Sequence, residues 1–346
     1  MILKKSCLAD NNSTISTIFA TNSKTETTPL MTTIAERAPV DQIMAELTPE
    51  RLLRKTNNGN NEVYLFKGPE SPILMQEVGR VRELTFRHAG GGTRGERDID
   101  HHDTDLSNPH QQLIVWDPEN RDIVGGYRYF IPARGCDGCG IENLASSPFF
   151  HFSESFKKEY FPYLMELGRS FVQPEYQSRA MGRKSLFALD NLWDGLGAIV
   201  IETPHLRYMF GKVTMYKSFN QKARDIILYF MRKHFGDDEN LVVPREPVEI
   251  ELPDEELKKI FVNENYEEDY KILSQEVRNL GETIPPLFNA YMNLSPTMKT
   301  FGTILNKGFG NVEETGIMIT IRDIYIDKVN RHLASYSDDF DFDRSD

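Results

Sequence analysis

Apolar residues recur every three or four positions in several segments of the chain, as they do on the buried face of a helix. In the clearest case Leu74, Val78 and Val81 keep this spacing, and the glycine run that begins at Gly90 ends the pattern. Helices are predicted in five segments: 38–56 with a break at Thr48 and Pro49, 73–90, 185–201, 218–235 and 284–294.

Other segments alternate apolar and polar residues or are rich in β-branched and aromatic residues, which is typical of strands. These segments are 62–68, 111–117, 121–133, 163–172, 207–215 and 316–326. From residue 62 to 235 the order is strand, helix, three strands, helix, strand and helix, which predicts an α/β fold.

The chain of 346 residues is long enough for one large core or two smaller ones. We expect a single domain over 34–335, because no internal repeat is found. Ser, Thr and Asn dominate residues 1–33, which we interpret as a disordered leader, and 336–346 as a solvated acidic tail. Prolines interrupt the acidic segment 244–273, so we expect a linker or a surface insertion near 240–275.

A formal net charge of -12 argues against a nucleic-acid-binding protein, which needs a dense basic face. No apolar run approaches the roughly 20 residues that a spanning helix needs, which leaves only peripheral contact with a membrane. Three cysteines argue against a disulfide framework and for a reducing compartment. We expect a cytoplasmic protein, with the inner face of the membrane as an alternative site.

Two small motifs raise the question of a metal site. Cys136 and Cys139 form a single C-x-x-C without a second pair at zinc-ribbon spacing. We interpret it as a loop, and a metal or redox site remains the alternative. His101 and His102 are adjacent, which is poor spacing for ligands, so we interpret this segment as a solvated loop and predict no metal.

The strand that ends at Val172 is followed by the pattern Gln177-x-x-Ala180-x-Gly182 at the start of a predicted helix. Small residues here let backbone N–H groups approach a phosphate closely, and the helix N-terminus adds partial positive charge. The pattern predicts a cradle for the phosphate of an acyl carrier. A plain turn with small residues for packing is the alternative, because short glycine-type motifs often match by chance.

The order of these elements and several motifs together resemble the GNAT superfamily of N-acetyltransferases. More narrowly, the chain resembles the hemolysin-like ornithine-lipid and glycine-lipid N-acyltransferases, which depend on acyl carrier protein (ACP) and are related to acyl-homoserine-lactone synthases. The resemblance implies a mixed, splayed β-sheet flanked by helices. It extends from about Ile73 to His332 and rests on "VRELTF", "DIDHHD", "IVGGYRYF", "FHFSESF", "MELGRSFVQPEYQ", "RYMFGKVTMY", "IPPLFNAYMNL" and "GFGNVEETGIMITIRDI".

Amide formation from a thioester needs a neutral amine and a polarised carbonyl, and proximity supplies much of the rate. Glu166 is the candidate general base, and an ion pair with Arg169 is its alternative role. The resemblance implies a bulge in this strand, with Arg169 as a second catalytic candidate. Backbone N–H groups of Ser170, Phe171 and Val172 would then bind pantetheine and the thioester oxygen.

The remaining candidates are assigned by charge and apolarity. Arg82, Arg128 and Arg169 suit an acceptor carboxylate, although Arg128 also fits an exposed strand position. Asp100 and Asp103 would order the acceptor loop or hold Arg82. The donor phosphate and ACP, or else only solvent, would face Gln177, Arg179, Ala180, Gly182, Arg183 and Lys184. An acyl channel, or alternatively plain core, would include Phe86, Phe130, Phe171 and Met209.

The sequence thus predicts an N-acyltransferase that moves a fatty acyl group, 3-hydroxylated by the family analogy, from acyl-ACP to the α-amine of glycine or ornithine. Glycine is slightly preferred, because no acidic pocket for a second amine is evident. No permanently bound cofactor is expected, and acyl-ACP or acyl-CoA would be the co-substrate. Two alternatives remain: an acetyl-CoA-dependent acetyltransferase and a non-enzymatic, hemolysin-like binding protein.

Overall fold

The structure is a computed structural model that describes residues 31–132 and 140–336. The helices are α1 (Val40–Glu46), α2 (Pro72–His88), α3 (His101–Thr104), α4 (Pro174–Gln177), α5 (Arg183–Glu202), α6 (Gln221–Phe235), α7 (Asp254–Ile260), α8 (Tyr266–Asn279), α9 (Pro286–Met292) and α10 (Ile326–His332). The strands are β1 (Leu52–Lys55), β2 (Glu62–Lys67), β3 (Gln111–Asp117), β4 (Asp122–Phe130), β5 (Phe150–Phe152), β6 (Leu164–Val172), β7 (Tyr208–Met215), β8 (Val242–Pro244), β9 (Lys299–Asn306) and β10 (Val312–Thr320).

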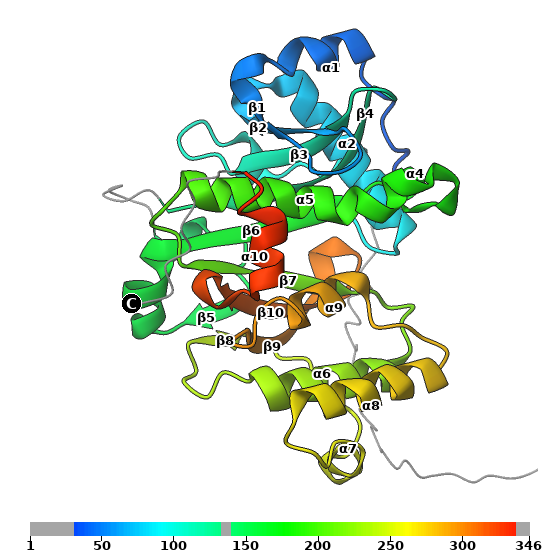
Figure 1. Ribbon diagram of the computed structural model, residues 1–346, viewed down its shortest axis with the longest axis vertical. Coiled ribbons are helices and arrows are strands. Elements are labelled where there is room, and N and C mark those ends of the chain that lie inside the picture. The colour runs from blue at the N-terminus through cyan, green and yellow to red at the C-terminus, as the bar shows by residue number, and fades with distance from the viewer. Residues whose placement is uncertain (1–30, 133–139, 337–346) are drawn as a thin grey trace, which may run out of the picture. The chain divides into compact units, whose positions relative to one another are not determined.

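Eight of these strands form one mixed sheet in the order β1-β2-β3-β4-β6-β7-β10-β9 (Figure 1). All neighbours in it are antiparallel except β6 and β7, which are parallel. A crossover through α5 joins these two strands, as a parallel pair requires. The predicted α/β class with a mixed sheet flanked by helices is therefore confirmed.

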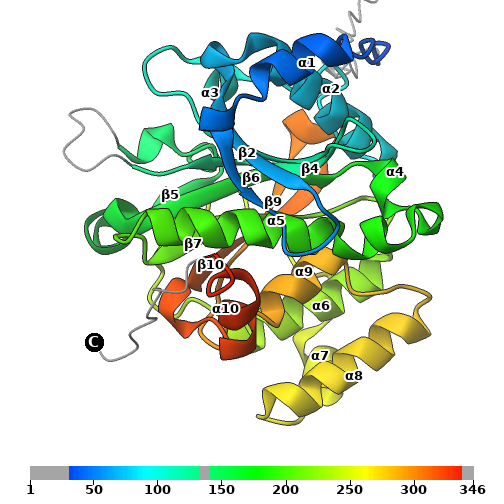
Figure 2. The same cartoon turned by 45° about the horizontal axis from the view of Figure 1, so that its top comes forward.

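Helices cover both faces of the sheet (Figures 1 and 2). One face packs against α1 and α2 through a cluster that includes Ile43, Leu74 and Ile114. The other packs against α5, α6 and α9 through the largest cluster, which includes Leu196 and Phe230. We call the first of these the α2 face. Among the described residues, no helix combines the length and the apolar composition needed to cross a bilayer.

The segment expected to be a linker or insertion contains helical structure that the sequence analysis missed. Helices α7 and α8 lie there, and α8 packs on α6. Leu257, Leu273 and Val277 are fully buried, because they recur on one side of each helix. Pro253 is the N-cap of α7, and no proline lies inside either helix, so the prolines do not prevent these helices.

Several smaller expectations also change. Strands β1, β5, β8 and β9 were not predicted, and β1 lies in a range that was predicted to be helical. Strand β9 shifts register against β10 near Gly302, whose φ of 83° disrupts the alternating pattern. Thr32 is bonded through its backbone N–H to the carbonyl of Arg94, so this residue belongs to the folded unit and not to a leader. The C-x-x-C at Cys136 and Cys139, residues 1–30 and the tail 337–346 lie outside the described residues.

Candidate active site

Strand β6 contains the bulge that the resemblance implies. Its register against β4 shifts after Gly168, so that Arg169 and Ser170 stand against a single residue, Tyr127. Arg169 has a φ of 50°, a left-handed conformation that residues other than glycine rarely adopt. The bulge carries the Arg169 side chain to the α2 face, where it contacts Asp98.

Next to the bulge, β6 separates from β7. The two strands pair only from Leu164 to Leu167 on β6, although β6 continues to Val172 and β7 to Met215. We call the point of separation the fork. A side chain at Gly168, just beyond the fork, would meet no atom within 4 Å. The sheet is therefore splayed, as expected, and the backbone of β6 beyond the fork is not paired with β7 in the described structure.

Helix α5 begins beside this open strand. Its N-cap is Gly182, whose φ of 56° and ψ of -123° strongly favour glycine. A Cβ at this position would meet nothing within 4 Å, so only the backbone conformation demands glycine here. The exposed Arg183 follows in the first turn. The Gln177 side chain donates a hydrogen bond to the carbonyl of Val172. This bond links residues 177–183, which we call the cradle segment, to β6.

The cradle segment is also anchored from the side of β3. Asp117 accepts a hydrogen bond from the Tyr176 hydroxyl at 3.0 Å and forms an ion pair with Lys184 at 2.6 Å. Lys184 also pairs with Glu119. Its charge, expected to face a phosphate or an acidic carrier, is therefore already balanced by two carboxylates.

Glu166 lies on β6 just before the fork and is 4% exposed. Its two carboxylate oxygens accept hydrogen bonds from the backbone N–H groups of Ala145 and Ser146 at 2.8 and 2.9 Å. Burial raises the pKa of Glu166, and these hydrogen bonds oppose the rise. The alternative ion pair with Arg169 is wrong, because Arg169 pairs with Asp98 and Asp100 instead. A buried carboxylate with a raised pKa is the type of group that serves as a general base.

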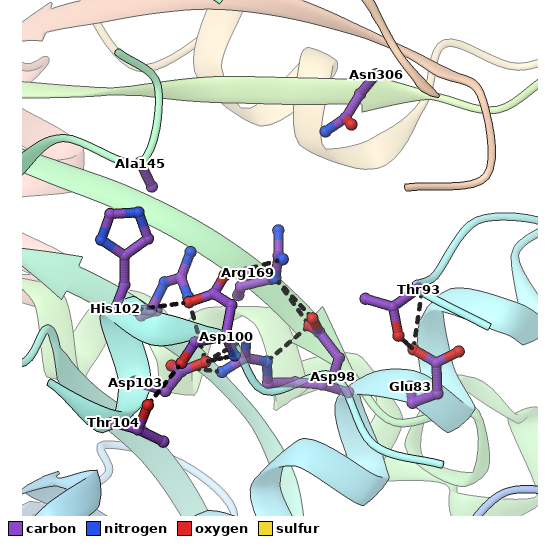
Figure 3. Close-up of polar contacts among 12 residues, drawn as sticks. Glu83, Thr93, Asp98, Asp100, His102, Asp103, Thr104, Ala145, Arg169 and Asn306 are labelled. Carbon is purple, nitrogen blue, oxygen red and sulfur yellow. Dashed lines mark hydrogen bonds and ion pairs between the residues drawn. The ribbon is translucent and has the colours of Figure 1, made fainter. Parts of the chain in front are cut away.

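Three arginines and three aspartates form a buried ionic network on the α2 face (Figure 3). We call them the Arg–Asp network: Arg82, Arg128, Arg169, Asp98, Asp100 and Asp103. Its formal charges cancel. Asp100 also caps helix α3, so this short helix and strands β4 and β6 are tied together.

The arginines of this network differ in their access to a substrate. Arg82 is fully buried and bonded to Asp98 and Asp103, which argues against contact with an acceptor. Arg128 is 3% exposed, so the alternative of an exposed strand position is wrong. Arg169 is the most accessible, and its guanidinium lies 4.6 Å from the centre of the Phe309 ring.

The electrostatics of the network keep its aspartates charged. Burial would raise the pKa of Asp100, but Arg128 and Arg169 lower it to about 2. Burial also opposes ionisation of Asp103, and Arg82 and Arg128 lower its pKa well below the usual range. Asp103 therefore holds Arg82, as expected, and Asp100 orders the loop that precedes α3.

A stack of imidazole rings covers one side of the network. His102 lies between His101 and His110, with ring centres 3.9 and 4.4 Å away, and His110 stacks on Phe130. Burial and the nearby Arg128 lower the pKa of His102 to about 4 and that of His110 to about 3. Both rings are thus neutral at neutral pH. The loop is solvated in part, because His101 and residues 104–107 are exposed, whereas His102 is half-buried and Asp103 and His110 are buried.

Comparisons with known proteins agree with this geometry. A family model described as an acetyltransferase (GNAT) domain matches residues 81–185, which include Glu166 and the start of α5. The chain is 54% identical over 295 residues to a glycine N(alpha)-acyltransferase of Bacteroides thetaiotaomicron, covering 85% of this chain and 87% of that one. It belongs to the glycine N(alpha)-acyltransferase family.

A second glycine N(alpha)-acyltransferase, from Phocaeicola vulgatus, is 52% identical over 302 residues, or 86% of this chain and 92% of that protein. No solved structure matches the chain. Membership of this family makes the protein an N-acyltransferase, so the non-enzymatic alternative is set aside.

The residues proposed for an acyl channel of this N-acyltransferase are divided among three apolar clusters. Phe86 and Phe171 belong to the cluster beneath α2, Phe130 to a separate aromatic cluster around Phe210, and Met209 to the core beneath α5. All four are at most 5% exposed. This distribution favours the alternative interpretation, in which they are core residues.

Sequence reasoning missed four polar residues near the site of the N-acyltransferase. Asp98 lies in the same loop as Asp100, and only its distant partners reveal its role. Lys212, Glu314 and Asn306 lie on the α2 face of neighbouring strands β7, β10 and β9. Lys212 did give a signal, since it is a lone charge within the apolar strand "YMFGKVTM".

Proposed function

We propose that this N-acyltransferase transfers a 3-hydroxylated fatty acyl group from acyl-ACP to the α-amine of glycine, as the first step of aminolipid synthesis. The fork between β6 and β7, with Glu166 just before it, carries the proposal. An unpaired strand beside a helix N-terminus suits a donor that consists of an extended amide chain and a phosphate. Glycine as acceptor follows from the two relatives, which are both glycine N(alpha)-acyltransferases.

On the donor side, backbone N–H groups of Ser170, Phe171 and Val172 would bind the pantetheine amides and polarise the thioester carbonyl. The phosphate would lie at Gly182, with Ala180 and the N-terminal turn of α5 around it. Arg179, Arg183 and Gln177 belong to the same cradle segment, and exposed Arg183 suits an acidic carrier protein.

On the acceptor side, Glu166 would accept the proton of the amine, directly or through a water molecule. Arg169 and Arg128 are the proposed partners of the acceptor carboxylate, because the Arg–Asp network fixes both guanidinium groups near the fork. Asp100 and Asp103 would position them, with Arg82 as the buried counterpart. Holding the acceptor in one orientation supplies much of the rate of such a reaction.

Purified protein tests this function directly. It is incubated with 3-hydroxyacyl-ACP, the matching acyl-CoA or acetyl-CoA, each with glycine, ornithine or alanine, and thiol release and product mass are measured. We expect acyl-ACP with glycine to give the highest kcat/KM. Turnover of acetyl-CoA alone, or no N-acyl product from folded protein with any donor, would overturn the proposal. New N-acyl glycines in lipids of expressing bacteria give the cellular readout.

The variant Glu166→Gln tests the proposed base. We expect kcat to fall about a hundredfold at neutral pH with little change in donor KM, because a general base contributes at this scale. Glu239→Gln is the control, since Glu239 is an exposed partner of Lys299. An unchanged rate in Glu166→Gln would remove Glu166 from the mechanism.

A further inference from the structure

A row of polar side chains crosses four adjacent strands on the α2 face. Strand register and alternation place Glu166 of β6, Lys212 of β7, Glu314 of β10 and Asn306 of β9 on this face. Apolar clusters flank the row, one around Phe210 and the other around Phe171 and Phe309. A polar row between two apolar clusters is costly unless its members satisfy one another.

Lys212 is the first residue of β7 beyond the fork and is the cation of the row. Its ammonium group lies 2.7 Å from a Glu314 carboxylate oxygen and 4.0 Å from the centre of the Phe149 ring. The side chain is only 14% exposed. Glu314 also accepts a hydrogen bond from Asn306 at 2.9 Å, so the lysine is held from the side of β10 and β9.

The row contains two carboxylates and one ammonium group. Glu314 has Lys212 as an ionic partner, whereas Glu166 accepts hydrogen bonds from the backbone N–H groups of Ala145 and Ser146. Lys212 lies on the same face of the neighbouring strand as Glu166. Burial raises the pKa of Glu166, the hydrogen bonds of Ser146 and Ala145 lower it, and the charge of Lys212 lowers it further. Without this cation, the buried carboxylate would hold its proton to a higher pH.

Other charged groups near Glu166 are already balanced. From β4 and β6, Arg128 and Arg169 pair with the aspartates of the Arg–Asp network. From α3, His102 is neutral at neutral pH because burial lowers its pKa. The loop before β5 contacts Glu166 through backbone N–H groups. Lys212 is thus the cation that is attracted to both carboxylates, and the strength of its pairing with Glu314 affects whether Glu166 is ionised.

We propose that Lys212, held in place by Glu314, is a positioning residue that keeps the Glu166 carboxylate ionised at the fork so that it can accept the proton of the acceptor amine. This inference rests on the proposed role of Glu166 as base. Lys212 acts through Glu166 and is not itself a group that touches the reacting atoms.

Two variants that change the charge in opposite directions test the proposal. Lys212→Met removes the cation, so Glu166 should hold its proton to higher pH, and Glu314→Gln frees the lysine and should have the opposite effect. The titration of Glu166 is followed by NMR of the 13C-labelled glutamate carboxyl group, assigned with Glu166→Gln. In parallel, kcat/KM for glycine is measured from about pH 5.5 to 9.

We expect Lys212→Met to lose about tenfold more activity at the acidic end of this range than at the alkaline end. Lys212→Arg should restore the profile, and Lys299→Met, which removes a more exposed lysine of β9, should not change it. The double variant Lys212→Met/Glu314→Gln should titrate between the two single variants. This result would show that the shifts come from the changed charges and not from damage to the fold.

The outcomes separate a failure of this proposal from a failure of the proposed role of Glu166 as base. Opposite shifts of the Glu166 titration in the two single variants support it, even where the rate profile does not follow and Glu166 proves not to be the base. An unmoved Glu166 titration in both variants overturns it. A higher glycine KM in Lys212→Met with an unmoved titration also overturns it, and would assign Lys212 to the acceptor carboxylate.

Discussion

The stability of the Arg–Asp network offers a direct test of the site's architecture. Asp103 is fully buried and pairs with Arg82 at 3.1 Å and Arg128 at 3.2 Å. The variant Asp103→Asn keeps the shape of the side chain and removes its charge. The three guanidinium groups of the network then share the two remaining carboxylates, Asp98 and Asp100.

The magnitude follows from these contacts. At an effective dielectric constant of about 20, two unit charges about 4 Å apart attract by about 4 kcal/mol, so Asp103 contributes about 8 kcal/mol to its two pairs. Desolvation of the carboxylate costs several kcal/mol and offsets about half of this. We therefore expect Asp103→Asn to lower the free energy of unfolding by about 3 to 5 kcal/mol.

Urea unfolding followed by tryptophan fluorescence and circular dichroism measures this change. Asp254→Asn is the matched control, because Asp254 pairs with Arg232 at 2.9 Å on the surface and should change stability by less than about 1 kcal/mol. A loss below about 1 kcal/mol in Asp103→Asn would refute the view that this network is a buried ionic unit.

The pH dependence adds a second check. The arginines hold the pKa of Asp103 below the ordinary aspartate value of 3.8, so its stabilising contribution is present above pH 3.8. It is lost as the pH falls through the pKa of the folded state. The stability difference between the wild type and Asp103→Asn should therefore be constant near neutrality and shrink in acid below pH 3.8.

Two further predictions concern the donor cradle and the histidine stack. Gly182→Ala strains a backbone with a φ of 56°, so we expect a several-fold higher donor KM and an unchanged glycine KM. The control is Gly281→Ala, with a φ of 80° at the end of α8, which should lose comparable stability, about 1 to 3 kcal/mol, without a change in KM. Equal donor KM values in the two variants would argue against a cradle at Gly182. Burial lowers the pKa of His110 from 6.5 to about 3, so the wild type should lose about 2 kcal/mol of stability between pH 6.5 and 5 as the unfolded chain takes up a proton. His110→Gln should make urea unfolding less dependent on pH in this window, and equal slopes for the two proteins would contradict the neutral ring.

The order of the main elements was predictable because each carries its own period of apolar residues. Helix α5 and strands β6 and β7 are close to their predicted bounds. The segment with α7 and α8 was misinterpreted, because its acidic residues and prolines obscured buried positions such as Leu257 and Leu273. Packing against α6 determines these helices, and a local pattern does not report a distant partner.

For the candidate site, the sequence predicted which elements lie together but not which side chains pair. Glu166 and Gly182 lie near each other in the chain because the strand, turn and helix that contain them are consecutive. The partner of Arg169 is 71 residues away at Asp98, and no local pattern contains that information. Lys212 was visible as a single charge in an apolar strand, but its meaning depends on Glu314 in a strand about a hundred residues later.

The fork leaves the sheet with a seam between two sets of strands, which are β1, β2, β3, β4 and β6 on one side and β7, β10 and β9 on the other. The proposed donor, acyl-ACP, has an extended pantetheine arm with two amides, which would pair with the unpaired backbone groups along this seam. Binding of the donor along the seam would link the two sets of strands, and release of the deacylated donor would separate them again. Rigidity would then rise and fall with each turnover, so slowed amide hydrogen exchange in β6 and β7 should report a loaded enzyme.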